Sequence, residues 1–266
     1  MVIFLKLGGS LITDKDKPLT AKIRTINRIG REISSALNLH NTIKLVVGHG
    51  SGSFGHSVAK KYGTRDGIKS EDDWLGFQKV WHAARDLNQI VIDHLINIEI
   101  PIISFPPSAY LTSSNGKLES WNYYPILSAL DHKLVPLIYG DVIFDQSKGS
   151  TIFSTEDLFS QLADILHPDL ILLAGKEPGV WKDFPKNNHI IKHLDPESYH
   201  RLYFEHIQSS SSPDVTGGMI SKINLMLDVV VRLPQTRVMI FSGKEPGNIL
   251  SALMGNHLGT MITADR

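Results

Sequence analysis

Residues 48–56 form the densest group of residues that can do chemistry. They read GHGSGSFGH, with four glycines, two serines and two histidines directly after the apolar run 43–47. Glycines at the exit of a buried strand let the backbone approach a ligand closely, and their N–H groups favour an anion such as phosphate. We expect the next helix to begin at His56, which would add an imidazole to these amides.

Two familiar patterns fit this loop only in part. Gly50, Gly52 and Gly55 satisfy the dinucleotide pattern G-x-G-x-x-G, but the acidic residue expected at the end of a second strand is missing. Residues 50–57 also read as a P-loop in which His56 replaces the required lysine. We therefore interpret the loop as an anion-binding nest with an added imidazole, with a structural turn as the alternative.

A second glycine turn, Lys6-Leu7-Gly8-Gly9-Ser10, ends the first apolar run, and Lys15 follows in a polar stretch. The glycines expose amides, and Lys6 places a fixed charge beside them. The alternative is a tight strand-to-helix turn with solvated lysines.

A third glycine turn, at residues 214–219, reads DVTGGM and is followed by Lys222. Glycine amides and a lysine at a helix N-terminus again suit an anion. Alternatively, Asp214 or Thr216 caps the helix, which does not account for Lys222.

Two further segments follow apolar runs. Residues 154–157 read STED, whose carboxylates can hold lysines in place or ligate Mg²⁺ through water, but which also suit a helix cap, and Gly140-Asp141 precedes them. Residues 175–181 read GKEPGVW, which suits either the wall of an adenine site or a plain β-turn.

Histidines and aromatic residues give weaker signals. The twelve histidines are scattered without an H-E-x-x-H pattern, so no metal site is predicted. Trp74, Phe77 and Trp81 lie at helical spacing, which indicates either core packing or a wall for the apolar tail of a ligand.

The elements that must position these motifs alternate along the chain. Apolar runs typical of buried strands occupy residues 2–7, 44–47, 101–105, 134–139, 170–174 and 237–241, and helical periodicity occupies 21–39, 71–96, 155–167 and 218–232. This alternation predicts an α/β fold, a three-layer α-β-α sandwich around a mostly parallel sheet whose strands bind ligands at their carboxyl ends. Residues 112–121 and 145–152 resemble hairpins, and 208–213 a surface loop. We expect one domain over 1–266, which divides into lobes 1–167 and 168–266 without an open linker between them.

Composition narrows the class of protein. Basic and acidic residues number 27 each, so no global field favours nucleic acid or an anionic membrane. The absence of cysteine excludes disulfides and a thiol nucleophile. No run approaches the length of a membrane span and no signal arrangement opens the sequence, so we expect a cytoplasmic globular protein.

The three glycine-and-lysine motifs, in this order, resemble those of the amino-acid kinase superfamily. The loop ending Gly-Ser-Phe-Gly-His resembles in particular the isopentenyl phosphate kinase family. The resemblance extends from Lys6 to Lys222 and implies ATP-dependent phosphorylation of isopentenyl phosphate, with Mg²⁺ as cofactor and a homodimeric assembly. Its partners would be ATP and a small alkyl phosphate.

The resemblance also implies roles for single residues. Those implied in catalysis are Lys6, Lys15, His56 and Lys222. Those implied in nucleotide binding are Gly8, Gly9, Ser10, Gly52, Gly179, Val180, Trp181, Gly217, Gly218 and Lys222. Those implied in acceptor binding are Ser51, Gly52, His56 and Thr155.

The sequence departs from the family in three places and leaves rival functions open. Ser51 replaces a usual glycine, residues 154–156 replace a Ser-Gly-Asp pattern, and residues 178–181 replace Asp-Gly-Val-Tyr. Either Glu156 or Asp157 can therefore organise the lysines. The rivals are a same-fold kinase for a fosfomycin-like phosphonate or a carboxylate, a non-catalytic nucleotide-binding module and, third, a dinucleotide oxidoreductase. The accepted chain length is not evident from the sequence.

Overall fold

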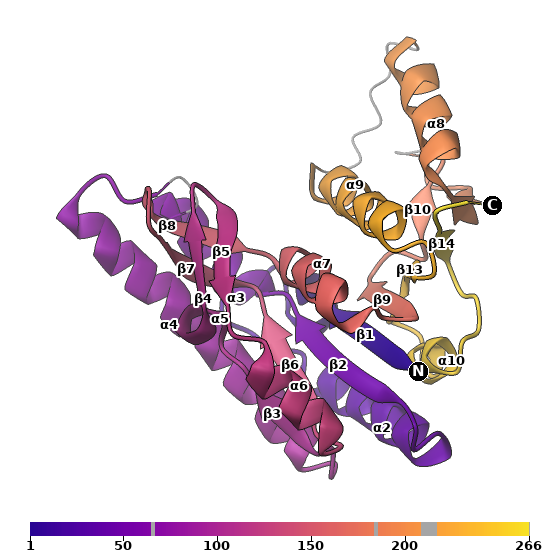
Figure 1. Ribbon diagram of the computed structural model, residues 1–266, viewed down its shortest axis with the longest axis horizontal. Coiled ribbons are helices and arrows are strands. Elements are labelled where there is room, and N and C mark those ends of the chain that lie inside the picture. Colours follow the sequence, from indigo (N-terminus) through magenta and orange to yellow (C-terminus); the bar gives the residue numbers. More distant parts are fainter. Residues whose placement is uncertain (65–66, 184–185, 209–216, 266) are drawn as a thin grey trace.

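The computed structural model describes residues 1–64, 67–183, 186–208 and 217–265. Its centre is an eight-stranded sheet in the order β12-β14-β13-β9-β1-β2-β6-β3 (Figure 1). In that order the strands are β12 (His193–Leu194), β14 (Thr260–Ile262), β13 (Arg237–Ser242), β9 (Leu170–Gly175), β1 (Val2–Leu7), β2 (Lys44–His49), β6 (Val135–Tyr139) and β3 (Ile102–Ser104). Only the β13–β14 pair within this sheet is antiparallel. The predicted mostly parallel sheet is confirmed.

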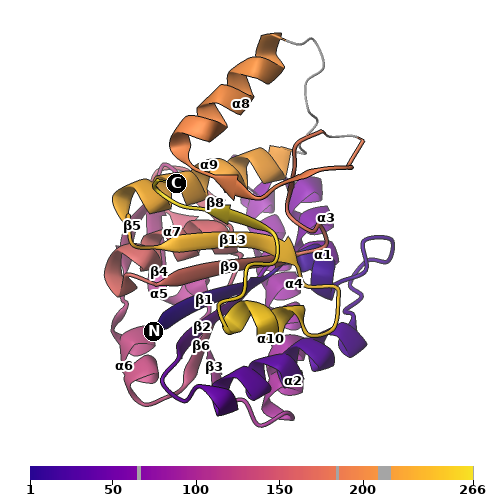
Figure 2. The same ribbon diagram turned by 90° about the vertical axis from the view of Figure 1, so that its right-hand side faces the viewer.

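Helices cover both faces of this sheet because its strands are apolar on both sides. Along β1, Ile3 and Leu5 join one hydrophobic core and Phe4 joins the other. The first core is closed by α2 (Ile23–Leu39), α4 (Glu71–Ile96) and α10 (Asn248–Leu253), and the second by α6 (Tyr124–Asp131), α7 (Thr155–Leu166) and α9 (Gly217–Arg232). Figure 2 shows α2 and α10 on one side of the strands and α7 and α9 on the other. The predicted three-layer architecture is confirmed.

One predicted helix boundary is wrong. Helix α3 (Gly52–Tyr62) begins at Gly52, so His56 is its fifth residue and not its start. The reason lies in the backbone: Gly52 has a φ of +49°, a conformation that glycine adopts without the usual steric cost, and the chain turns into the helix there. By contrast, α4 has the predicted bounds and begins with a capping box between Ser70 and Asp73.

A second, four-stranded sheet carries both predicted hairpins. Its order is β5 (Lys117–Trp121), β4 (Leu111–Ser114), β7 (Asp141–Asp145) and β8 (Gly149–Phe153), and Figure 1 shows it beside α4. Asn115 and Gly116 both have positive φ, as expected for a tight hairpin turn. Asp145 accepts hydrogen bonds from the N–H groups of Asn115, Gly116 and Ser147, which joins the two hairpin turns.

The remaining elements are short or peripheral. They are α1 (Gly9–Ile12), α5 (Pro107–Tyr110), α8 (Pro196–Gln208), β10 (Val180–Trp181) and β11 (Ile190–Ile191). The predicted surface loop 208–213 lies outside the described residues except for Gln208, the last residue of α8. Within the described ranges, no helix has the length and hydropathy needed to span a bilayer.

Candidate active site

The register of the central strands brings the glycine motifs to one edge of the sheet. Leu7, the last residue of β1, pairs with His49 of β2 and Ala174 of β9, and His49 pairs with Tyr139 of β6. Each of these four paired residues is followed immediately by a glycine. The chain continues from β1 to β2 on one side of β1, and it later forms β9 on the other side of β1. The β1–β9 junction is therefore a topological switch point. Ligands bind at such points in open α/β sheets.

The first two glycine turns touch each other through their backbones. A Cβ added to Gly9 would lie 2.6 Å from the Cα of Gly52, and one added to Gly52 would lie 2.7 Å from the carbonyl oxygen of Gly9. Thr13 stabilises the contact, because its Oγ1 donates to the Gly9 carbonyl at 2.7 Å and accepts from the Ser53 N–H at 3.0 Å. The turns therefore form one backbone surface with the N-terminus of α3 in it, which suits a phosphate.

Lys6, Glu156 and Lys222 form a charged centre beside this surface. The ammonium group of Lys6 contacts Oε1 of Glu156, and the ammonium nitrogen of Lys222 lies 3.5 Å from the same oxygen. Lys6 and Glu156 are 9% and 6% exposed, so their charges are largely shielded from water. Burial alone would raise the pKa of Glu156, but the charges of Lys6 and Lys222 outweigh it and lower this pKa to about 2. The carboxylate thus stays ionised and holds two lysines from distant parts of the chain.

The same geometry decides which acidic residue organises the lysines. Ser154 is the N-cap of α7, and its Oγ accepts from the Asp157 N–H at 3.1 Å while the Asp157 carboxylate accepts from the Ser154 N–H at 2.8 Å. Asp157 therefore serves the capping box. Glu156, one position earlier, turns towards Lys6 and Lys222. Both interpretations of residues 154–157, helix cap and lysine holder, hold for different side chains.

The Thr155 hydroxyl forms a hydrogen bond within the protein. Thr155 is buried, and its hydroxyl donates to the carbonyl oxygen of His49 at 2.6 Å. This hydrogen bond links α7 to the end of β2, so Thr155 stabilises the start of the glycine loop that follows β2. Its assignment to acceptor binding stays a prediction.

His49, which precedes the loop, is a buried support. Its ring stacks on Tyr139 with centroids 5.4 Å apart, and its Nε2 lies 3.3 Å from Oδ1 of Asn88. Burial is the main influence on its pKa and lowers it to about 4, so the imidazole is neutral at pH 7. Its neutral state adds no charge to the site.

The other predicted catalytic and acceptor-binding residues lie near the same edge of the sheet. Ser51 is the N-cap of α3 and is half-buried. The backbone of His56 belongs to the first turns of α3, but its side chain lies outside the described part of the structure. Lys15 is exposed in the segment between α1 and α2. The structure therefore brings Lys6 and Lys222 together and leaves the reach of Lys15 and His56 as a prediction.

Most of the predicted nucleotide-binding residues lie in three segments of the chain. Gly8 lies at the carboxyl end of β1, where its N–H donates to the Ala174 carbonyl at 2.8 Å. Gly9 and Ser10 begin α1. Gly179 packs against β14, because an added Cβ would lie 2.7 Å from Oγ1 of Thr260.

Beyond Gly179, the Val180 N–H donates to Oγ1 of Thr260 at 2.8 Å. The indole N–H of Trp181 donates to Glu177 at 2.9 Å. Gly217 and Gly218 begin α9, and a Cβ added to Gly218 would meet no atom within 4 Å. Asp214 and Thr216 lie outside the described residues.

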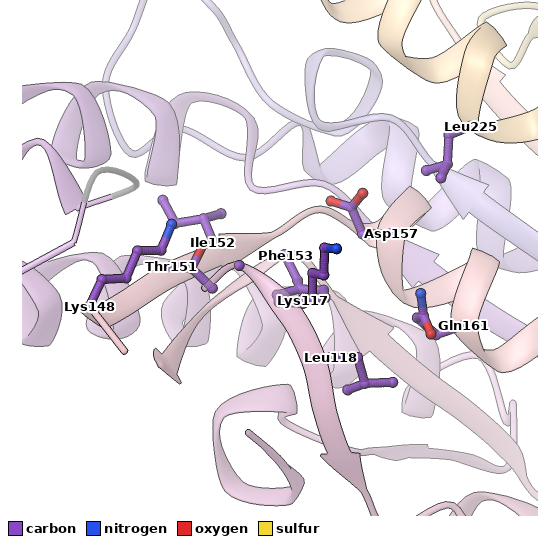
Figure 3. Close-up of a pocket in the computed structure, with 10 residues that line it drawn as sticks. Lys117, Leu118, Lys148, Thr151, Ile152, Phe153, Asp157, Gln161 and Leu225 are labelled. Carbon is purple, nitrogen blue, oxygen red and sulfur yellow. The ribbon is translucent and has the colours of Figure 1, made fainter. Parts of the chain in front are cut away.

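Two cavities flank this edge. One, of about 280 Å³, lies beyond β9 and β13 and includes Lys176, Ser242, Lys244 and Asn248 in its wall. The other, of about 540 Å³, lies between the hairpin sheet and helices α7 and α9. Figure 3 shows Lys117 and Lys148 of this larger cavity on the hairpin side and Asp157, Gln161 and Leu225 on the helices.

The aromatic stripe, formed by Trp74, Phe77 and Trp81 of α4, divides into core and surface residues. Phe77 is buried and lies 4.6 Å, between ring centroids, from Phe144 of β7. Trp74 packs on both rings but is 42% exposed, and Trp81 is half-buried beside the same small cluster. Phe77 therefore belongs to the core, whereas the two tryptophans are accessible to a ligand.

Two lysines near the glycine turns were given no role in the sequence analysis. Lys22 immediately precedes α2, and its ammonium group donates to the Ser10 carbonyl at 3.4 Å. Lys176 immediately follows β9. Neither stands in a glycine motif with a recognised spacing, although the position of Lys176 directly after a strand was a usable signal.

Comparisons with known proteins agree with this geometry. The model of the amino acid kinase family matches residues 1–242. The isopentenyl phosphate kinase of Methanocaldococcus jannaschii is 36% identical, with 98% of both chains covered, and that of Methanothermobacter thermautotrophicus is 33% identical, with 98% of this chain and 99% of the relative covered. A solved structure of an isopentenyl phosphate kinase superposes with a TM-score of 0.81 at 29% identity, covering 99% of this chain and 100% of the other. The chain therefore belongs to the amino acid kinase family, within which its sequence groups with the isopentenyl phosphate kinases.

Proposed function

We propose that this protein transfers the γ-phosphoryl group of ATP to isopentenyl phosphate, forming isopentenyl diphosphate and ADP. The observation that carries the proposal is the buried Lys6–Glu156–Lys222 centre beside the joined glycine turns. Phosphoryl transfer needs positioned positive charge and backbone donors around the transferring group. Relatives of full length that carry this enzyme name support the choice of acceptor.

The chemistry requires no general base. The second pKa of a phosphate monoester is near 6, so an acceptor oxygen is already ionised at pH 7. That oxygen forms a bond to the γ-phosphorus while the bond from phosphorus to the β–γ bridging oxygen breaks, and ADP leaves with the electron pair. The main barrier is repulsion between two polyanions. Lys6 and Lys222 reduce it, with Lys15 and His56 as further predicted cations.

The residues fit a nucleotide whose phosphates lie on the glycine turns. Side chains at Gly9 and Gly52 would collide with the facing turn and push the two turns apart. Mg²⁺ would neutralise phosphate charge when bound. Among the described residues, no three histidine or acidic side chains form a group that could hold a metal ion. In this proposal the nucleotide binds mainly to lobe 168–266 and the acceptor to lobe 1–167.

His56 is assigned to the phosphate of the acceptor. A dianion would favour its protonated form, which then donates a charged hydrogen bond. We expect His56→Ala to lower kcat/KM for isopentenyl phosphate by roughly 10- to 150-fold, the equivalent of roughly 1.5–3 kcal/mol, while ADP binding is retained. His82→Ala, on an exposed turn of α4, is the matched control. Normal turnover by His56→Ala would remove His56 from the mechanism.

Substrate comparison tests the function itself. Purified protein is supplied with ATP and, in separate assays, isopentenyl phosphate, fosfomycin and acidic amino acids, and ADP release is measured. We expect the highest kcat/KM with isopentenyl phosphate. Preference for fosfomycin or an amino acid would assign a different acceptor. ATP binding without turnover of any acceptor would indicate a nucleotide-binding module.

The proposal also covers the oligomeric state of the protein and its location in the cell. We propose a homodimer, following the family resemblance, and light scattering after size-exclusion chromatography measures the mass directly. A monomer would contradict it. An ATP-consuming reaction is consistent with a cytoplasmic location, which cell fractionation tests.

A further inference from the structure

Two lysines meet at the topological switch point of the sheet. Lys22 immediately precedes α2, and Lys176 immediately follows β9. The segments that carry them are neighbours, because Leu7 at the end of β1 pairs with Ala174 of β9, and the charge of Lys22 acts on Lys176 there. Both residues are half-buried, so water screens their charges only in part. Neither lysine belongs to the Lys6–Glu156–Lys222 centre.

The position of this lysine pair is fixed from both sides. The Lys22 ammonium group donates to the carbonyl of Ser10, which ties it to the glycine turn after β1. Lys176 stands in the wall of the 280 Å³ cavity, together with Lys244, Glu245 and Asn248 from the segment after β13. The pair therefore lies between the proposed phosphate surface and a cavity large enough for part of a nucleotide.

Two ammonium groups close together repel each other. Burial and the charge of Lys22 both lower the pKa of Lys176, and the carboxylates of Asp14 and Asp16 oppose this effect only in part. An anion with more than one negative charge would remove the repulsion. A phosphate group has this charge, and lysine binds phosphate as a point charge.

We propose that Lys22 and Lys176 together bind the polyphosphate chain of the nucleotide, at the switch point between β1 and β9. This inference rests on the proposed function, since it concerns the same nucleotide. It adds two cations from outside the glycine motifs to nucleotide recognition. It also predicts that the pair destabilises the nucleotide-free protein, because the repulsion is then unrelieved.

The test removes each charge separately. Lys22→Met and Lys176→Met are compared with Lys44→Met, which removes a lysine at the amino end of β2, on the opposite edge of the sheet. Calorimetry with ADP and with inorganic tripolyphosphate should show binding about tenfold weaker in the first two variants and unchanged in the control. KM for ATP should rise about tenfold, and KM for isopentenyl phosphate should stay within twofold.

A charge reversal gives an independent readout. Lys22→Glu should form an ion pair with Lys176, so the melting temperature of the nucleotide-free protein should rise while ADP binding weakens further than in Lys22→Met. A lysine pair with a purely structural role predicts a lower melting temperature for all three variants at these positions.

The inference is overturned if the variants bind ADP and tripolyphosphate as tightly as Lys44→Met does. It is also overturned if the wild-type protein binds neither compound. The proposed function fails in a different way, when wild-type protein binds ADP but does not phosphorylate isopentenyl phosphate.

Discussion

Replacing Glu156 with glutamine tests the charged centre most directly. The glutamine keeps the size of the side chain and an oxygen for Lys6, but it removes the negative charge that Lys6 and Lys222 share. A carboxyl whose pKa falls from 4.5 in the unfolded chain to about 2 in the folded protein contributes about 3 kcal/mol of stability at pH 7. Removing one partner of a buried ion pair has a cost of similar size, about 3–5 kcal/mol. We therefore expect Glu156→Gln to lower the free energy of unfolding by about 3 kcal/mol at pH 7.

The sign of the pH dependence follows from the lowered pKa. The stabilisation is complete above pH 4.5 and is lost as pH falls towards 2, because the unfolded chain binds the proton first. The difference in unfolding free energy between wild type and Glu156→Gln should shrink to about 1.5 kcal/mol at pH 3. Urea unfolding at pH 7, 5, 4 and 3, followed by circular dichroism, measures this difference.

A matched control separates the ion pair from a general loss of charge. Glu119→Gln makes the same substitution on the exposed face of β5 and should change stability by less than about 0.5 kcal/mol at every pH. Because Glu156 also orients the lysines, kcat should fall in Glu156→Gln even at temperatures where the variant is fully folded. A stability difference that stays constant from pH 7 to pH 3 would show that the charge of Glu156 does not hold the lysines.

Three further predictions concern the backbone surface, a buried acid and the aromatic stripe. Gly52→Ala should destabilise the protein by at least about 3 kcal/mol and Gly63→Ala by about 1 kcal/mol, because both have positive φ but only Gly52 has close neighbours. Equal losses in thermal unfolding would show that the contact between the turns is unimportant. Burial raises the pKa of Asp141 to about 6, so wild-type stability should fall as pH rises from about 4 to 6. Asp141→Asn should remove this fall and gain up to about 3 kcal/mol at pH 7 relative to wild type, and melting curves with the same pH slope in both proteins would contradict the argument. Trp74→Ala and Trp81→Ala should each shift kcat/KM towards longer alkyl phosphates. An unchanged ratio across chain lengths would leave both tryptophans as packing residues.

The sequence by itself determined the architecture and the edge of the sheet that carries the site. Continuous apolar runs such as 2–7 and 170–174 predict strands buried on both faces, and the 3.6-residue periodicity of 71–96 predicts the helix that the structure shows. These patterns are local, because burial of a face selects residue types along a single element. The glycine turns after the first and second apolar runs could be placed at one edge, since parallel strands end at the same edge. The third turn opens a helix and was joined to them only by the family resemblance.

Only the tertiary structure decided which side chains meet at that edge. Glu156 and Asp157 are neighbours with the same charge, and their roles differ because Asp157 stands at the third position of α7, where it reaches the N-cap, while Glu156 faces Lys6. The lysine pair of Lys22 and Lys176 depends on the pairing of β1 with β9. Such contacts join residues far apart in the chain, and strand register and helix rotation fix them. No local pattern in a single sequence encodes the strand register or the rotation of a helix about its axis.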